Sequence, residues 1–308
     1  MKEMIKVKAP ATSANLGPGY DSFGLALNLF NEYQFKITNN LKLKIEIKDN
    51  QQSFVNIKKE DNLILKTIEY MKQKHIDKIK TDNLEIKVKL NYPINRGLGS
   101  SANAIIAVIC GLNELYTLNL NTDQILNYAL KLEGHPDNIV PTLLGGFSIN
   151  KIEDDCLSYE IFKLSPKINT LLFIPEFPIK TAEARRVIED KISINKVIKN
   201  IANASLITSG LIKNDIKLLK KGSKDYIHQN KRLRLNDNLN SFFKKMNIRT
   251  ECPFFLSGSG STIIFFSDKE FSLTKKIIKN TAEQLNISYD IKESKINNEG
   301  IIINRDRK

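Results

Sequence analysis

The amino-acid sequence predicts an α+β fold in two domains, and three observations support this prediction. The first half of the chain mixes segments of alternating polar and apolar residues with segments of helical period. These segments do not alternate strictly, which argues against a doubly wound parallel sheet. After Phe147 the sequence becomes more polar, and it then provides a second set of apolar strands and amphipathic helices. We therefore expect domains at residues 1–158 and 159–308.

In the first half, strands are expected where charged residues alternate with isoleucine, leucine or valine. They are predicted at residues 5–9, 31–38, 41–48 and 84–91. In the last two, the lysines form the solvated face and the branched residues form the buried face. Helices are predicted at residues 62–74, 101–116 and 122–132, with Thr122 as the expected cap of the last one.

In the second half, the run NTLLFIPEF at residues 169–177 is typical of a buried strand. A further pair of apolar strands is predicted around the Gly/Ser turn of residues 253–266. Amphipathic patterns predict helices at residues 181–190, 193–210, 214–219, 239–246 and 268–285.

Charge and composition argue against several classes of protein. The formal charge is +13, but much of the lysine lies in strand-like alternations and no basic cluster is interleaved with aromatic residues, so we expect no nucleic-acid partner. The longest apolar run, residues 104–110, is too short to span a bilayer, and the N-terminus lacks the apolar core of a signal peptide. We therefore expect a cytoplasmic protein without a membrane partner. Its three cysteines and three histidines are scattered, without metal-ligand spacing.

A glycine-rich loop joins the strand at residues 84–90 to an apolar helix, in the sequence PINRGLGSSANA from Pro93 onward. Glycines let backbone N–H groups approach a ligand, and the helix N-terminus adds partial positive charge, so this segment predicts an anion-binding site. It is not a P-loop, because no lysine follows the second glycine. It also fits a dinucleotide fingerprint poorly, since Ala102 stands at the third glycine position. Such a site needs a countercharge, for which Mg²⁺ held by a hydroxyl and a carboxylate is a candidate.

Three other stretches are also rich in turn-forming and polar residues. They are APATSANLGPGYDSFGLAL at residues 9–27, EGHPDNIVPTLLGGF at residues 133–147, and SGSGST at residues 257–262. Any one of them alone is compatible with a capped turn. Together and in this order, they resemble the motifs of the homoserine kinases, within the superfamily of galactokinases, homoserine kinases, mevalonate kinases and phosphomevalonate kinases.

The resemblance covers nearly the whole chain. The first motif and the His-Pro-Asp-Asn stretch separate the homoserine kinases from mevalonate kinases, which begin with Ala-Pro-Gly-Lys, and from diphosphocytidyl kinases, which begin with Pro-Ala-Lys. The resemblance implies transfer of the ATP γ-phosphoryl group to the side-chain hydroxyl of L-homoserine, with Mg²⁺, in threonine biosynthesis. It also implies an N-terminal domain like that of a small-subunit ribosomal protein, a ferredoxin-like C-terminal domain, ATP in the cleft between them, and a homodimer.

The same resemblance implies a pocket for the homoserine zwitterion. Asn15 and Asp21 match the amine-binding positions, and His135 lies nearby in the motif. The positions that bind the carboxylate match Thr181, Arg185 and Arg232. Arginine suits this role because its planar fork meets a carboxylate with parallel hydrogen bonds.

One departure from the family pattern bears on this pocket. Asn230 and Lys231 stand where Pro and Tyr are usual, so Arg234 is an alternative to Arg232.

Phosphate and metal binding are implied for two loops. The nucleotide-binding positions match Pro93, Arg96, Gly97, Leu98, Gly99, Ser100, Ser101 and Ala102 in one loop, and Ser257, Gly258, Ser259 and Gly260 in the other. Ser101 and Glu133 match the Mg²⁺ ligands. The second loop departs from the family at Ser261, where Pro is usual.

Two catalytic roles remain open at the sequence level. Homoserine kinases are thought to lack a catalytic base, so Asn138 would orient the substrate hydroxyl, while Asp137 beside it is the alternative as a base. Three other functions also compete. They are a related kinase acting on another small alcohol, a non-catalytic nucleotide sensor, and an RNA-binding protein. The complete first motif argues against the related kinase, and the presence of Glu133 and the loop serines argues against the sensor.

Overall fold

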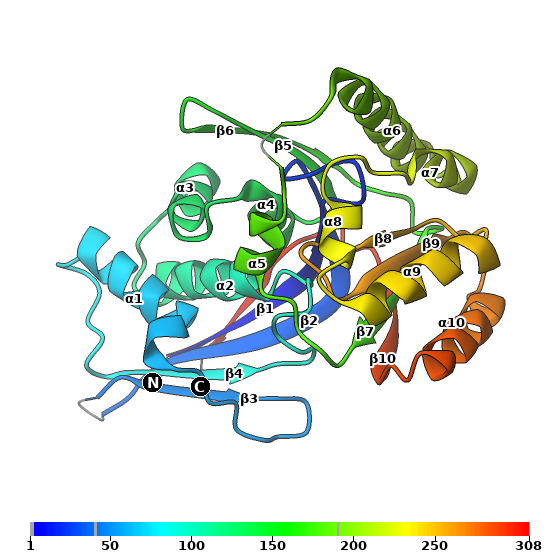
Figure 1. The fold of residues 1–308 in the computed structure, drawn as a ribbon. Coiled ribbons are helices and arrows are strands. Elements are labelled where there is room, and N and C mark those ends of the chain that lie inside the picture. Colours follow the sequence, from blue (N-terminus) through cyan, green and yellow to red (C-terminus); the bar gives the residue numbers. More distant parts are fainter. Residues whose placement is uncertain (1–2, 40–41, 190, 308) are drawn as a thin grey trace.

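The computed structural model describes residues 3–39, 42–189 and 191–307. Over these residues the chain forms two sheets with helices packed against them, so the predicted α+β class is confirmed (Figure 1). The first sheet has the order β11-β1-β2-β4-β3, and the hairpin β5-β6 joins it beside β2. Its strands are β1 (Glu3–Ala14), β2 (Phe23–Ile37), β3 (Lys44–Lys48), β4 (Leu84–Lys89), β5 (Phe147–Glu153), β6 (Cys156–Phe162) and β11 (Ile302–Arg307).

The second sheet is antiparallel, with the order β10-β7-β9-β8. Its strands are β7 (Asn169–Pro175), β8 (Phe254–Leu256), β9 (Ile263–Ser267) and β10 (Tyr289–Lys295). The predicted strand at residues 169–177 and the strand pair around the Gly/Ser turn both belong to this sheet.

Helices from the two halves of the chain cover the two sheets (Figure 1). The first sheet carries α1 (Leu63–Lys74), α2 (Ser100–Leu115), α3 (Thr122–Glu133) and α4 (Pro136–Leu144). The second half contributes α5 (Thr181–Arg186), α6 (Ile194–Lys213), α7 (Ile216–Gly222), α8 (Gln229–Leu233), α9 (Asp237–Arg249) and α10 (Ser272–Gln284). A short 3-10 turn at Lys59–Asp61 precedes α1. None of the helices in the described part of the chain is long and apolar enough to cross a membrane.

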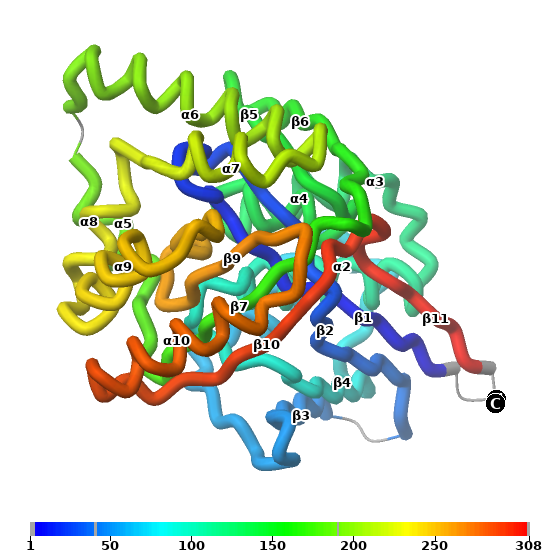
Figure 2. The backbone as a smooth tube through the Cα atoms, turned by 90° about the vertical axis from the view of Figure 1, so that its right-hand side faces the viewer, coloured from blue at the N-terminus to red at the C-terminus, as the bar shows by residue number. Residues whose placement is uncertain are grey.

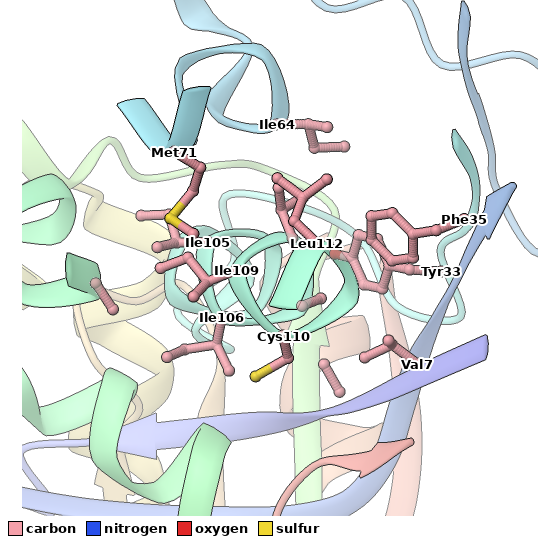
Figure 3. Packing of buried hydrophobic residues seen from close by; sticks show 14 of the residues in the cluster. Val7, Tyr33, Phe35, Ile64, Met71, Ile105, Ile106, Ile109, Cys110 and Leu112 are labelled. Atoms are coloured by element: carbon pink, nitrogen blue, oxygen red, sulfur yellow. The ribbon is translucent and has the colours of Figure 1, made fainter. Parts of the chain in front are cut away.

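Helix α2 is the centre of the first core. It is apolar around most of its circumference because β1 and β2 lie on one side of it and α1, α3 and α4 on the others. Its residues Ile105 and Ile109 lie near Met71 of α1, and Leu112 lies near Phe35 of β2 (Figure 3). Burying each such side chain stabilises the fold by about 1.5–3 kcal/mol. Because α2 is fixed in this core, the glycine loop that precedes it is held in one position.

The two sheets share a second core. Leu25 of β2 and Phe147 of β5 belong to the same buried cluster as Leu172 of β7, Phe255 of β8 and Ile264 of β9. The chain also crosses between the sheets at its end, because β10 belongs to the second sheet and β11 lies beside β1 (Figure 2). The expected domain boundary at residues 158/159 falls inside β6, and residues 302–307 return to the first sheet.

Some strands and helices begin or end at other residues than the sequence predicted, because contacts with neighbouring segments stabilise them in addition to the local preference of their residues. Strands β1 and β2 are longer than predicted because they pair with each other from Met4↔Lys36 to Ala14↔Gly24. The predicted strand at 41–48 begins in the structure at Lys44, and its first residue, Leu41, lies outside the described residues. The predicted cap of α3 is wrong, because Asn121 forms the capping box with Gln124.

Several elements have no sequence expectation at all. Strands β6 and β10 alternate exposed and half-buried residues without a clear apolar face, and hydrogen bonding to β5 and β7 stabilises them. Helix α4 was hidden by its composition, since Pro136 at its first position and Pro141 inside it are typical of turns. The predicted helix at 181–190 ends as α5 at Arg186, and its last position, Asp190, lies outside the described residues.

Candidate active site

A cleft opens where the glycine loop, the turn at residues 15–22 between β1 and β2, and α4 meet α5, α8 and the Gly/Ser turn of the second sheet. It contains about 600 Å³ of space, part of which is open to solvent. Its lining consists of Ala14, Asn15, Asp21, Asn95, Gly97, Gly99, Ser100, Ser101, Glu133, His135, Asp137, Asn138, Thr181, Arg185, Arg232, Gly258 and Ser259. The fold thus brings together residues that are up to 245 positions apart in the chain, because both ends of the sequence contribute to one core.

Most of the predicted site residues lie in this lining, and two lining residues, Ala14 and Asn95, had no prediction. The predicted nucleotide-binding residues outside the lining are Pro93, Arg96, Leu98, Ala102, Ser257 and Gly260. Leu98, Ala102 and Ser257 are buried in the supporting structure. The Arg96 guanidinium donates hydrogen bonds to carbonyl oxygens of Pro175 and Glu176, so it ties the loop to the end of β7.

Two glycines shape the loop through close approaches. Gly99 precedes α2 in the left-handed region, with φ of 66°, and a Cβ there would lie 1.9 Å from Thr12 Oγ1. Gly97 has φ of 74°, and a Cβ there would lie 2.1 Å from the carbonyl oxygen of Ser257. Both positions therefore require glycine on conformational and steric grounds. Because Gly99 brings no side chain, the first N–H groups of α2 stay available to an anion.

Direct hydrogen bonds join the glycine loop to the Gly/Ser turn of the second sheet. The Ser257 hydroxyl lies 2.6 Å from the carbonyl oxygen of Gly97 and 2.8 Å from Ser13 Oγ. The Thr262 N–H donates to the Arg96 carbonyl oxygen at 3.1 Å. The two loops are thus one rigid wall of the cleft, and that wall contains the predicted phosphate-binding residues.

A hydroxyl and a carboxylate lie together beside this wall. The hydroxyl of Ser101, in the first turn of α2, donates a hydrogen bond to Glu133 at the end of α3. Burial raises the pKa of Glu133. A hydroxyl and a carboxylate are hard oxygen donors, which suit Mg²⁺. The described residues contain no group of three or more His, Cys, Asp or Glu side chains arranged for a metal, so an ion here would need further oxygen ligands from water or a phosphate.

The residues expected to bind opposite ends of a zwitterion bind each other. Arg185 donates to Asp21 through both terminal nitrogens, at 3.0 Å and 2.8 Å, and to Tyr20 Oη at 3.2 Å. The carboxylate raises the pKa of Arg185. About a third of each side chain is exposed, 31% for Arg185 and 32% for Asp21, so both face the cleft. The pair offers one positive and one negative group to a ligand.

Asn15 fixes the position of Asp21 through hydrogen bonds of its side chain. Its Oδ1 accepts from the backbone N–H of Asp21 at 2.9 Å, and its Nδ2 donates to the Gly258 carbonyl oxygen at 3.1 Å. Both Asn15 and Asp21 have positive φ, of 70° and 53°, which asparagine and aspartate tolerate better than most residues. Asn15 thereby joins the turn at residues 15–22 to the Gly/Ser turn.

Arg232, and not Arg234, occupies the cleft. Arg232 is only 2% exposed, and it donates to the carbonyl oxygens of Ala184 and Gly258 at 3.1 Å and 2.9 Å. Its guanidinium lies over the Tyr20 ring, 5.0 Å from the centroid. Arg234 is exposed and does not line the cleft.

The Tyr20 ring forms a platform between the arginines and a buried histidine. The ring also stacks on His228, with 5.1 Å between centroids. His228 Nε2 lies 2.7 Å from the Gly17 carbonyl oxygen, and burial lowers the pKa of His228 to about 4 although Asp225 is nearby. His228 is therefore neutral at pH 7. Sequence reasoning missed Tyr20 and His228, and the only signal for Tyr20 was its position beside Asp21.

The candidate catalytic residues begin helix α4. Asp137 is buried, and its burial, reinforced by the Asp21 carboxylate, raises the pKa of Asp137 to about 7. Asn138 Nδ2 donates to Asp137 Oδ1 at 3.3 Å. His135 precedes this helix, and burial lowers its pKa. Across the cleft, the hydroxyl of Thr181 at the start of α5 lies 3.5 Å from Ser259 Oγ.

Comparisons with known proteins point to kinases of one family. The GHMP kinases N terminal domain family matches residues 62–146. The homoserine kinase of Clostridium botulinum (strain Eklund 17B / Type B) is 33% identical over 300 residues, which cover 97% of this chain and 98% of that protein. The homoserine kinase of Halothermothrix orenii is 33% identical over 302 residues, covering 97% and 96%.

Solved structures show the same fold. The homoserine kinase of Cytophaga hutchinsonii has a TM-score of 0.83 at 24% identity, covering 97% of each chain. The mevalonate diphosphate decarboxylase of Staphylococcus aureus has a TM-score of 0.67 at 16% identity, covering 98% of each chain. About a third of the residues are identical over nearly the full length of these relatives, and one cleft contains the glycine loop, the Ser101–Glu133 pair and the Arg185–Asp21 pair. This chain therefore belongs to the homoserine kinase family.

Proposed function

We propose that the protein transfers the γ-phosphoryl group of ATP to the side-chain hydroxyl of L-homoserine, giving O-phospho-L-homoserine and ADP, as a step of threonine biosynthesis. The observation that carries the proposal is the bidentate Arg185–Asp21 pair, which faces a cleft also lined by the glycine loop that we predict to bind an anion. In a small alcohol that carries an ammonium and a carboxylate, the ammonium can take the place of Arg185 beside Asp21, and the carboxylate can take the place of Asp21 beside Arg185. A neutral alcohol can replace neither.

Substrate binding is an exchange of ion pairs in this proposal. The homoserine ammonium takes Asp21, and its carboxylate takes Arg185 and the adjacent Arg232, so no charge is left without a partner. Tyr20 and His228 hold the two guanidinium groups in place during the exchange. Each charge-assisted hydrogen bond contributes about 1.5–3 kcal/mol, which is enough to select the zwitterion.

Phosphate binding uses the backbone of residues 97–101 and the start of α2. Mg²⁺ bound at Ser101 and Glu133 would neutralise charge on the phosphates. The loop itself contributes backbone donors and no lysine, so the protein positions the phosphates and leaves much of the countercharge to the ion.

The proton of the attacking hydroxyl can go to one of two acceptors, an oxygen of the transferred phosphoryl group when Asn138 only orients the hydroxyl, or the Asp137 carboxylate acting as a base. Asn138 lies in the cleft and can orient the hydroxyl through its amide. Asp137 is buried, and with a pKa of about 7 it is only partly ionised at neutral pH. A carboxyl with that pKa is well matched to accept a proton near neutral pH. We favour Asn138 as the orienting group, with Asp137 holding the Asn138 amide.

A coupled ADP-release assay tests the function, with ATP and Mg²⁺ and with homoserine, serine, threonine and mevalonate as separate acceptors. Two further acceptors separate the charges, because 4-hydroxybutyrate lacks the ammonium and 2-amino-1,4-butanediol lacks the carboxylate. We expect rapid turnover of homoserine and at least about 10-fold lower kcat/KM for each analogue, since each loses charge-assisted bonds. Equal turnover of homoserine and 4-hydroxybutyrate would contradict the zwitterion pocket. Turnover of none of the acceptors would contradict the kinase proposal.

Three further expectations accompany this function, and the family resemblance supports them. We propose a homodimer, to be measured by light scattering during size-exclusion chromatography. We propose a cytoplasmic location, to be measured by fractionation of the source cells. We also propose that no nucleic acid is bound, because the sequence has no basic cluster interleaved with aromatic residues, and some lysines of the first sheet pair with acids, as in Lys8–Glu32 and Lys44–Glu85. Salt-sensitive RNA binding that ATP does not compete would contradict this.

A further inference from the structure

Thr12 lies where β1, the glycine loop and α4 meet. It belongs to the motif at residues 9–27, but no role was predicted for it and it does not line the cleft. It belongs to β1, its side chain is fully buried, and its Oγ1 lies 2.7 Å from Asn138 Oδ1 on α4. Its backbone N–H donates to the Leu98 carbonyl oxygen at 3.2 Å. The Cα of Gly99 packs so closely that a Cβ there would lie 1.9 Å from Thr12 Oγ1 and 2.9 Å from Asn138 Oδ1.

This contact sets which end of the Asn138 amide faces which neighbour. The Thr12 hydroxyl donates to Asn138 Oδ1, and Asn138 Nδ2 donates to Asp137 Oδ1 at 3.3 Å. In the flipped amide, Nδ2 would donate to the Thr12 hydroxyl, whose own hydrogen would lose its acceptor, and Oδ1 would face the carboxylate of ionised Asp137, so the second bond would be lost. The hydroxyl and the carboxyl therefore select one orientation, in which the remaining N–H of Nδ2 has no protein partner among the described residues.

Burial makes the selection strong. Thr12 is 0% exposed, so water does not compete for its hydroxyl, and loss of that donor leaves the Asn138 oxygen without a bond in a confined space. Gly99 lies against both groups on the loop side, which limits movement of the Asn138 amide toward the loop. The orientation of Asn138 and the conformation of the phosphate loop are thus linked through one hydroxyl group.

We propose that Thr12 is a positioning residue for phosphoryl transfer, whose hydroxyl holds the Asn138 amide with its N–H groups turned toward Asp137 and the cleft, where the attacking hydroxyl would lie. The proposal rests on the proposed function. Thr12 touches neither substrate, so it acts through Asn138. It therefore affects the rate of the chemical step more than the binding of either substrate.

The first experiment compares Thr12→Val, which keeps the shape and removes the hydroxyl, with Thr12→Ser, which keeps the hydroxyl. We expect Thr12→Val to lower kcat about 10-fold while both KM values stay within about 3-fold, and Thr12→Ser to stay within about 3-fold of the parent in kcat. Thr142→Val is the matched control, because Thr142 is a buried threonine on α4 whose hydroxyl has no hydrogen-bond partner in the described part of the chain. Its kcat is expected to stay unchanged.

A double-mutant cycle with Asn138→Ala then separates positioning from general support of the fold. If Thr12 acts through Asn138, Thr12→Val has little further effect once Asn138 is alanine, so the double variant matches Asn138→Ala within about 2-fold. An additional 10-fold loss in the double variant would overturn the proposal, as would a Thr12→Val defect confined to KM for ATP, which would indicate a role in the loop alone.

A readout without turnover keeps the two proposals distinguishable. In ¹⁵N-labelled protein, the side-chain amide signals of Asn138 are identified by their loss in Asn138→Ala. We expect Thr12→Val to shift them and Thr12→Ser to leave them close to the parent positions. Unshifted signals in a folded Thr12→Val variant would overturn the positioning role. Failure of the parent protein to phosphorylate homoserine, with the shift observed, would instead overturn the proposed function.

Discussion

Arg185→Ala is the sharpest test of the proposed substrate site. In the structure Arg185 makes two charge-assisted hydrogen bonds to Asp21, and in the substrate complex we expect it to give these to the homoserine carboxylate. Two such bonds contribute about 3–6 kcal/mol. The Arg185–Asp21 pair that must first separate is about one-third exposed, and an ion pair of this kind is worth about 0–1 kcal/mol.

The difference between these contributions sets the expected loss. Because Arg232 remains to bind part of the carboxylate, we expect Arg185→Ala to cost about 2–4 kcal/mol, or about 30- to 1000-fold in kcat/KM for homoserine. KM for ATP is expected to change by no more than about 3-fold, since the hydrogen bonds of the Arg185 side chain to other described residues go to Tyr20 and Asp21, not to the phosphate loop.

The assay is steady-state ADP release with each substrate varied at saturating concentrations of the other. Arg186→Ala is the matched control, because Arg186 is the next residue of α5, is exposed and does not line the cleft. Its kinetic constants are expected to equal those of the parent. Equal increases of KM for ATP and homoserine in Arg185→Ala would refute the assignment, since they would indicate general damage to the cleft.

Three other variants probe the rest of the site. Glu133→Gln is expected to raise the Mg²⁺ concentration for half-maximal rate at least about 10-fold, because it removes the charge from the Ser101–Glu133 pair; an unchanged magnesium titration would remove Glu133 from the metal site. Tyr20→Phe keeps the ring under Arg232 but loses the hydrogen bond to Arg185, so KM for homoserine is expected to rise about 2- to 10-fold, and no change would mean that the hydroxyl is dispensable. Burial raises the pKa of Asp137 to about 7, so above pH 4 the unfolded chain loses this proton before the folded protein does, and stability falls as pH rises to about 7. Asp137→Asn is therefore expected to raise Tm relative to the parent more at about pH 8 than at about pH 5, and an equal difference at both pH values would contradict the raised pKa.

Parts of the site could be predicted because their chemistry is local. The glycine loop, its strand and its helix are consecutive in the chain, so Gly97, Gly99 and the start of α2 indicated an anion site without any tertiary information. Asp21, Arg185 and Glu133 came from motifs whose residue types match their chemistry, and all three line the cleft. Their roles remain predictions that the variants above test.

Other parts depended on contacts between distant segments. The sequence favoured Arg232 and left Arg234 as an alternative. Only the packing of α8 beside Tyr20 decides between them, because it buries Arg232 in the cleft and leaves Arg234 exposed. Arg96 was expected at the nucleotide but binds carbonyl oxygens at the end of β7, which is a segment 79 residues away. Strand β11 could not be assigned to the first sheet, because its register depends on β1.

The sequence by itself determined the α+β class through its periodicity and the family through its motifs, because both are patterns of neighbouring residues. It also predicted the phosphate loop and the charged residues that we propose to bind a zwitterion. The tertiary structure alone decided that Arg185 and Asp21 pair with each other, that Asp137 is buried with a raised pKa, and that Thr12 contacts Asn138 across 126 positions. These properties arise from burial and distance between segments far apart in the chain. No local pattern encodes such distances, because they depend on how the two sheets close around one core.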